Sequence, residues 1–237
     1  MIKLDNITKI FHIPHEKRDT LKDNVVDMFR RVSYEPLYAL QNIYFDIMPG
    51  EFIGIIGPNG CGKTTLLKII AGILIPSQGK VTTKGKISPF LELGVGFDPN
   101  LTARENVYQN GIILGLSHKE ITKKFLQIID FSELERFVDT RLKDFSSGMQ
   151  VRLAFAVAIQ VNADILLMDE VLAVGDAKFQ NKCFKVFDDF KKQGKTIILV
   201  THDMGAVEKH CKRAIYLDNG RIKSDGDPKK VVEQYLN

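Results

Sequence analysis

The sequence predicts an α/β fold with a mostly parallel β-sheet, an antiparallel β subdomain and an inserted α-helical subdomain. Short apolar runs typical of buried strands alternate with helical segments in the second half of the chain. A glycine-rich loop joins one such strand directly to a helix, and residues 102–162 show helical patterns only. We therefore predict a core from residues 1–91 and 163–237, with residues 92–162 as the helical subdomain.

The composition is that of an ordinary globular protein. Of 237 residues, 44% are apolar and 26% are charged, which is enough for one sizeable core. The formal charge of +4 is mild, and no run of five basic residues occurs, so we expect no nucleic-acid partner. The apolar runs are strand-sized, well below the roughly 20 residues that span a membrane. We also expect no signal peptide, because the N-terminal stretch alternates like a strand.

The three cysteines are Cys61, Cys183 and Cys211. Their odd number and wide spacing fit neither a disulfide framework nor a zinc site. We interpret them as free thiols in a reducing cytosol.

Strands are predicted at residues 1–11, 39–47, 79–84 and 87–91, with a turn at 48–50. The first two strands are separated by about 27 residues, whereas hairpin loops usually have two to five. Within this segment an apolar stripe recurs at helical spacing and predicts an amphipathic helix at about residues 19–32: Leu21, Val25, Met28, Phe29 and Val32. This helix either packs on its own sheet or docks on a partner, and Arg30 and Arg31 would suit a membrane surface or an anionic substrate.

Residues 52–56 form the next predicted strand, and residues 57–64 match the pattern G-x-x-x-x-G-K-[ST] in full. Its glycines let backbone N–H groups face a polyphosphate, and the following helix directs its positive end at the same group. Lys63 would contact the β- and γ-phosphates, and Thr64 would offer its hydroxyl to Mg²⁺. The motif predicts a P-loop nucleoside triphosphatase core that binds ATP and Mg²⁺. The predicted phosphate-binding residues are Gly57, Pro58, Asn59, Gly60, Cys61, Gly62, Lys63, Thr64 and Thr65.

Three helices are predicted in the central block, within residues 102–115, 117–131 and 146–162. Ser117 and Glu120 form a capping box at the start of the second. The third follows "FSSGMQ", where a serine hydroxyl caps the helix and its first N–H groups offer a second anion site. One γ-phosphate held between the P-loop and this second site would suit a dimer in which each site comes from a different subunit.

Strands return at residues 164–170, 196–202 and 214–218, each followed by a predicted helix. Asp169 ends a buried strand, where its carboxylate would hold the Mg²⁺ shell. Glu170 follows and would accept a proton from the attacking water or orient it. His202 ends the next strand, close to the ligand crevice of such a sheet, and we expect it to contact the γ-phosphate.

The P-loop, "FSSGMQ", "ILLMDE", "AVGD" and "THD", in this order and spacing, resemble the nucleotide-binding subunit of ABC transporters over essentially the whole chain. The resemblance places Asp176 at the family's D-loop and makes His202 the switch histidine. It implies a head-to-tail homodimer with two ATP molecules at the interface, which drives a separate polytopic membrane subunit from the cytoplasmic face of the membrane. The residues that it places at the signature motif are Ser146, Ser147, Gly148 and Met149.

The sequence departs from the family pattern at several positions. Ser147 replaces the first signature glycine, Met149 replaces the glutamine, and no Q-loop glutamine is present. Glu92 stands nearest to that place, and the resemblance leaves open whether it substitutes as a contact to Mg²⁺. The aromatic residue that stacks on adenine is expected to be Tyr38, with Phe11 as the alternative.

Further features resemble the subfamily that exports O-antigen, capsule or teichoic acid: "LELGVGF", "SSGM", "EVLAVGDAKFQ", the insert after the first strand and the ending "GDPKKVVEQYL". They imply a lipid-linked polysaccharide as the indirect partner. An ATPase for a small-solute transporter is the alternative within the family. A soluble ABC protein acting on ribosomes, DNA or Fe–S assembly is a third interpretation, although such proteins usually carry two ATPase domains or coiled-coil insertions. The sequence leaves open which glycan is carried and whether a carbohydrate-binding domain follows Asn237.

Overall fold

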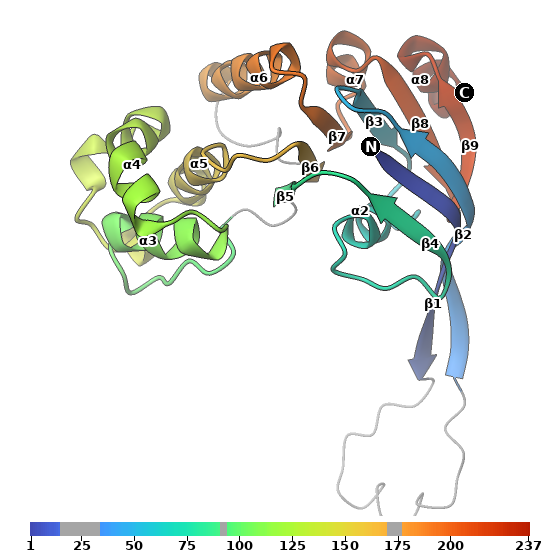
Figure 1. Ribbon diagram of the computed structural model, residues 1–237, viewed down its shortest axis with the longest axis horizontal. Helices are drawn as coiled ribbons and strands as arrows, with labels where there is room; N and C mark the ends of the chain where they lie inside the picture. The colour runs from blue at the N-terminus through green and yellow to red at the C-terminus, as the bar shows by residue number, and fades with distance from the viewer. Residues whose placement is uncertain (15–33, 91–93, 170–176) are drawn as a thin grey trace, which may run out of the picture.

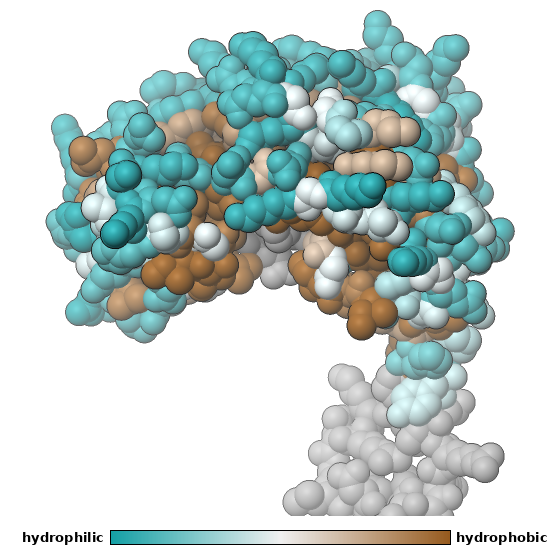
Figure 2. All heavy atoms as spheres, viewed as in Figure 1, coloured by the Kyte–Doolittle hydropathy of each residue, from teal (hydrophilic) through white to brown (hydrophobic). Residues whose placement is uncertain are grey.

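A computed structural model describes residues 1–14, 34–90, 94–169 and 177–237. Two β-sheets and four of the described α-helices make up one limb of a bent molecule, and a helical block makes up the other (Figure 1). Viewed from the same side, the molecule is hollowed between the two limbs, and apolar side chains gather along that hollow (Figure 2).

The main sheet has six strands in the order β5-β6-β7-β3-β8-β9. All neighbouring pairs are parallel except β8 and β9, which confirms the predicted mostly parallel sheet. The strands are β3 (Phe52–Ile56), β5 (Ile87–Phe90), β6 (Ile165–Asp169), β7 (Thr196–Val200), β8 (Arg213–Asp218) and β9 (Arg221–Gly226). Every residue of β3 and β7 is buried, as expected of central strands covered on both faces.

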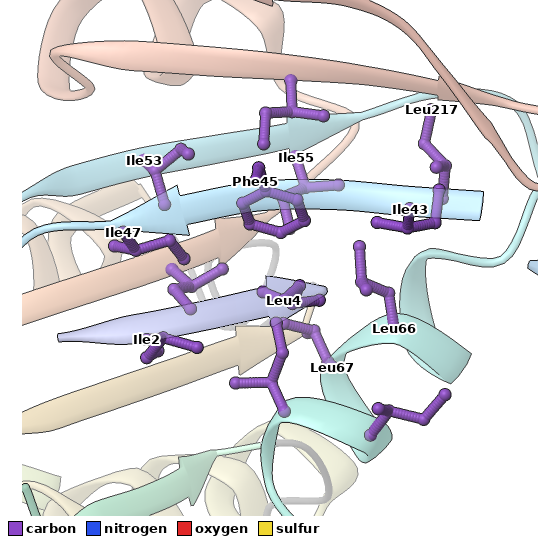
Figure 3. Close-up of a cluster of buried hydrophobic side chains, with 14 of the residues drawn as sticks. Ile2, Leu4, Ile43, Phe45, Ile47, Ile53, Ile55, Leu66, Leu67 and Leu217 are labelled. Atoms are coloured by element: carbon purple, nitrogen blue, oxygen red, sulfur yellow. The ribbon is translucent and has the colours of Figure 1, made fainter. Parts of the chain in front are cut away.

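Alternate residues of these strands point to opposite faces, and each face has its own apolar cluster. On one face, Phe52, Leu166 and Ile197 pack with α6 (Ala177–Lys192), α7 (Met204–His210) and α8 (Pro228–Leu236). On the other face, their chain neighbours Ile53, Leu167 and Ile198 pack with α2 (Lys63–Ile70) and the second sheet. Figure 3 shows this second cluster, in which Ile2 and Leu4 lie close to Leu67 of α2. The glycine-rich loop between β3 and α2 is therefore held between two layers.

The second sheet is antiparallel and has the order β2-β1-β4, with β1 (Ile2–Pro14), β2 (Tyr34–Ile47) and β4 (Gln78–Thr83). The expected long connection between the first two strands is partly wrong, because β1 and β2 continue to pair as far as Pro14 and Tyr34. The expected amphipathic helix at about 19–32 lies outside the described residues.

The helical block contains α3 (Ala103–Ile113), α4 (His118–Ser132) and α5 (Ser147–Ala158), with short 3₁₀ turns at Glu135–Phe137 and Leu142–Asp144. Ser117 and Glu120 form the predicted capping box of α4. Thr102 and Glu105 form a second box at α3, which the sequence analysis did not predict. A separate apolar cluster, with buried residues from Ala103 to Val161, holds the block together.

One predicted strand–helix pair is wrong. β8 is followed not directly by a helix but by the antiparallel strand β9. Asn219 and Gly220 form the turn between them, with φ values of 46° and 71°, the left-handed geometry that a two-residue hairpin requires.

Candidate nucleotide-binding site

The glycine-rich loop leaves the carboxyl end of β3 and enters α2 at Lys63. Two of its glycines have neighbours that exclude any side chain. A Cβ on Gly57 would lie 2.0 Å from the carbonyl oxygen of Leu217, and one on Gly62 would lie 2.5 Å from that of Ala39. The loop is therefore clamped between β2 and β8, and at these two positions only the backbone can face a ligand.

Lys63 is buried beneath this loop, only 7% exposed. Its Nζ donates to the carbonyl oxygens of Gly57 at 2.7 Å and Pro58 at 2.9 Å. Gly62, in the N-cap position of α2, has no side chain to satisfy the first N–H groups of the helix. The ammonium group and the helix N-terminus thus converge on one small volume, an arrangement that favours a polyphosphate.

Asp169 lies at the end of β6, and Thr64 is the second residue of α2. The Thr64 hydroxyl donates to the Asp169 carboxylate at 2.7 Å, across 105 residues of sequence. Hydroxyl and carboxylate oxygens are the ligands that Mg²⁺ prefers, so this pair fits the ion that a nucleotide would bring.

His202 follows β7, the strand that lies between β3 and β6. Its side chain is exposed. Asp203, the next residue, caps α7 by accepting a hydrogen bond from the backbone N–H of Ala206 at 3.0 Å, which fixes the loop. Because parallel strands end at one edge of the sheet, His202 emerges between the P-loop and Asp169.

A cavity of about 270 Å³ opens over the P-loop. Both aromatic candidates for adenine stacking line it, and they come from paired strands: Phe11 from β1 and Tyr38 from β2. The choice between them therefore stays open. The other residues that line the cavity are Leu37, Ala39, Asn59, Gly60, Gly62, Lys63, Thr64 and Thr65.

The signature residues lie in the other limb of the molecule, at the start of α5 (Figure 1). Ser146 is the N-cap, and its hydroxyl accepts from the backbone N–H of Met149 at 3.3 Å. Ser147 is exposed, and no atom lies closer than 4.0 Å to a Cβ built on Gly148. None of these residues lines the cavity over the P-loop, so one chain does not bring its own two anion sites together.

Three predicted site residues, Glu92, Glu170 and Asp176, lie outside the described residues. Their roles stay predictions.

The sequence analysis missed the turn that supports the P-loop from behind. The backbone N–H of Gly220 donates to the carbonyl oxygen of Cys61 at 3.0 Å, and its carbonyl accepts from the N–H of Gln41 at 2.7 Å. The Asn-Gly pair between two alternating segments is a hairpin signal that could have located the turn. Its contact with Cys61, 159 residues earlier in the chain, leaves no pattern in the local sequence.

All three cysteines are free and buried. Burial raises the pKa of the Cys61 thiol, and the nearby Lys63 ammonium opposes that rise only in part. Burial raises the pKa of Cys183 and of Cys211 to about 12. These thiols are therefore protonated packing groups rather than nucleophiles.

A parallel sheet that ends in a glycine-rich loop, a buried lysine and an aspartate bound to the P-loop threonine defines a P-loop nucleoside triphosphatase. A family model described as "ABC transporter" matches residues 40–173. The chain belongs to the ABC transporter family, as an ATP-binding subunit that hydrolyses ATP.

Named relatives agree with this assignment. The "O-antigen export system ATP-binding protein RfbB" of Klebsiella pneumoniae is 42% identical over 238 residues, which cover 99% of this chain and 97% of that protein. The "Teichoic acids export ATP-binding protein TagH" of Bacillus anthracis is 38% identical over 99% of this chain but only 42% of its own length. These names belong to the exporter subfamily that the sequence motifs resemble, which confirms that interpretation.

Solved structures confirm the fold. The dimeric ATP-binding cassette MJ0796, in a post-hydrolysis state with ADP and Pi, matches with a TM-score of 0.77 and 29% identity, over 96% of this chain and 99% of that one. Among the described residues, no helix is long and apolar enough to cross a membrane.

Proposed function

We propose that this chain uses ATP hydrolysis to drive export of a polysaccharide, carried on a lipid, through a separate polytopic membrane subunit. The observation that carries the proposal is the contact between Thr64 and Asp169 beside the P-loop, in a chain that is similar to O-antigen export ATPases over nearly their full length. The first part supports the nucleotide chemistry, and the second supports the cargo.

The nucleotide roles follow from the position of each group. Lys63 and the first N–H groups of α2 bind the β- and γ-phosphates, while Thr64 and Asp169 hold Mg²⁺. The bound ion would neutralise charge on the phosphate oxygens. Glu170, the residue after Asp169, accepts a proton from the attacking water, and His202 contacts the γ-phosphate. Glu92 and Asp176 complete the site as a Q-loop substitute and a D-loop contact.

The second half of the site comes from a second copy of the chain. Ser146, Ser147, Gly148 and Met149 lie at a helix N-terminus that is separate from the chain's own P-loop cavity. A head-to-tail pair would place this terminus against the γ-phosphate bound by the partner. The dimeric form of the cassette MJ0796 supports this arrangement.

The membrane subunit would contact an apolar surface on the helical block. Val95, Ile112 and Ile113 each expose about half of their side-chain surface. They lie together, because Asn110 Nδ2 donates to the Val95 carbonyl at 2.7 Å and Ile113 packs against Gly96. Exposed apolar groups of this kind are typical of protein contacts. This contact would hold the chain on the cytoplasmic face of the membrane.

The test is replacement of the protein in its own cells by the variant Lys63→Ala. Loss of the lysine should abolish ATP-driven export, so that surface glycan disappears and lipid-linked glycan accumulates inside the cell. Lys123→Ala, which removes an exposed lysine of α4, should leave export unchanged. Normal surface glycan together with a lost solute flux would overturn the polysaccharide assignment in favour of a small-solute transporter.

A second measurement separates transport from other ABC functions. The protein should copurify from native membranes with a polytopic membrane protein that carries lipid-linked glycan. Ribosomal, DNA or Fe–S partners without a membrane protein would contradict transport altogether.

A further inference from the structure

Glu133 occupies an unusual backbone position at the C-cap of α4. Its φ of 59° and ψ of 40° place it in the left-handed region. Glycine is favoured at such a helix end, because a Cβ atom lies too close to the backbone carbonyl there, and asparagine is tolerated because its short polar side chain can hydrogen-bond locally. A glutamate at this position suggests that its carboxylate makes an interaction that compensates for the backbone strain and that glycine could not make.

That carboxylate lies among three cations from two different helices. Arg152 of α5 places Nη1 3.4 Å from Oε2. Lys182 and Lys178 of α6 place Nζ 3.5 Å and 3.8 Å from Oε1. The side chains of Glu133, Arg152 and Lys182 are 34%, 20% and 33% exposed, so their interaction is partly shielded from solvent.

The two cations nearest to Glu133 are fixed by other contacts. The Arg152 guanidinium lies over the ring of Phe179 at 5.0 Å, and the Lys182 ammonium lies over the ring of Phe131 at 4.7 Å. Lys182 Nζ also donates to the Phe131 carbonyl at 2.9 Å. If the carboxylate were removed, Arg152 and Lys182 would both lose their ion pair with Glu133, and the charged link that this residue makes to both would be gone.

The two helices also meet through apolar side chains, since Phe155 of α5 packs against Phe179 and Phe187 of α6. α6 packs on the main sheet through Phe179, Cys183 and Phe187. α5 begins with the signature residues, only five positions before Arg152. Glu133 is thus the counter-ion between the helix that carries the signature and a helix of the core.

We propose that Glu133 is a positioning residue that fixes the signature helix against the core, so that the signature meets nucleotide on the partner copy in the correct orientation. The inference rests on the ATP-bound dimer put forward under Proposed function. It predicts that removal of the carboxylate weakens dimerisation and hydrolysis without weakening nucleotide binding to one chain, because Glu133 does not line the P-loop cavity.

The experiment compares Glu133→Gly, Glu133→Gln and Glu135→Gln. Glycine suits the left-handed backbone, so Glu133→Gly removes the charge while relieving strain. Glu135→Gln removes an exposed carboxylate two residues away and is the matched control. Three quantities are measured: the melting temperature, the affinity of dilute protein for ATP without Mg²⁺, and ATP-dependent dimerisation together with kcat.

Glu133→Gly and Glu133→Gln should bind ATP within about twofold of wild type but lose about five- to tenfold in dimerisation and kcat. Glu133→Gly should melt no lower than wild type. Glu135→Gln should behave as wild type.

Two results would overturn the inference. If wild type dimerises with ATP and both Glu133 variants dimerise equally well, the positioning role alone fails. If wild type hydrolyses ATP without dimerising, the proposed dimer is wrong, and the positioning role of Glu133, which depends on that dimer, is wrong as well.

Discussion

At the scale of single residues, the nucleotide site depends on close backbone contacts as much as on charged groups. Gly57 and Gly62 lie against carbonyl oxygens of β8 and β2, and Gly220 ties the loop to the β8–β9 turn. These contacts hold the P-loop backbone in place before a nucleotide arrives, which lowers the entropy cost of ordering it on binding.

Gly220→Ala tests this support. A Cβ at Gly220 would lie 2.8 Å from the Ala39 carbonyl oxygen, so the turn must shift and the bond to Cys61 must lengthen. We expect ATP affinity to fall about fivefold and the protein to lose about 2 kcal/mol of stability. Gly194→Ala is the control, since Gly194 has a similar φ of 74° but no atom near its Cβ position. It should cost about 1 kcal/mol and leave ATP affinity unchanged, as measured by calorimetry and denaturant unfolding. Equal ATP affinity in the two variants would show that the β8–β9 turn does not support the P-loop.

His210 should make the fold sensitive to mild acid. Burial lowers the pKa of its imidazole, Lys209 and Lys191 lower it further, and Asp188, 3.8 Å away, only partly opposes them. The unfolded chain, with a histidine pKa of about 6.5, then binds a proton more readily than the folded chain. The contribution of neutral His210 to the stability of the fold is fully present above that pH and is lost as the pH falls below it. His210→Gln should therefore reduce the drop in melting temperature between pH 7 and pH 5, and an unchanged drop would exclude His210 as its source.

The sequence predicts site residues most directly where one motif names both the residue type and its place. Lys63, Thr64 and Asp169 are of this kind, and the structure brings the last two into contact. Gly220 and Glu133 are not, because their partners lie far away in sequence and only tertiary packing brings them together. Tyr38 and Phe11 are an intermediate case. The sequence names both as candidates for adenine stacking, but the pairing of β1 with β2 places both at one cavity and does not choose between them.

At the scale of elements, most strands and helices of the core follow the sequence pattern, but β9 and the ends of β1 and β2 do not. Pro14 and Pro36 argue against a strand, because proline cannot donate to a sheet ladder. β2 is an edge strand, and β1 becomes one beyond Thr8, where its pairing with β4 stops. An edge strand tolerates proline, which explains why the ribbon extends further than the sequence predicts.

Deleting residues 19–32 tests the insert at the tip of this ribbon. Because β1 and β2 pair as far as Pro14 and Tyr34, the deletion leaves about five residues to close the hairpin, a normal length. ATPase activity of the isolated subunit should stay within about twofold, whereas export should fall at least about tenfold, on the view that the segment docks on a partner. Replacing the segment by a Gly-Ser linker of equal length separates lost contacts from altered length. Collapse of ATPase activity in the isolated subunit would show instead that the segment is structural.

At the scale of the whole molecule, the two anion sites lie in separate limbs, at the N-termini of α2 and α5 (Figure 1). The physics of one chain gives two half-sites and a reason for each to bind phosphate. It does not show that the two half-sites of different copies meet around one nucleotide. The two anion sites suit a dimer, the resemblance to a family implies one, and a solved structure of a dimeric cassette supports it.

Glu170→Gln tests directly whether two copies of the chain bind ATP between them. The amide keeps the shape of the side chain but cannot accept a proton, so hydrolysis should fall at least about a hundredfold. ATP would then remain bound between two P-loops and two signatures, and a stable dimer should appear by light scattering only when ATP and Mg²⁺ are present. The double variant Lys63→Ala with Glu170→Gln should stay monomeric, because it loses the phosphate contact that ATP binding needs. A Glu170→Gln protein that hydrolyses ATP at the normal rate would move the general base elsewhere. One that is inactive yet monomeric with ATP bound would refute the two-copy site while leaving the P-loop chemistry intact.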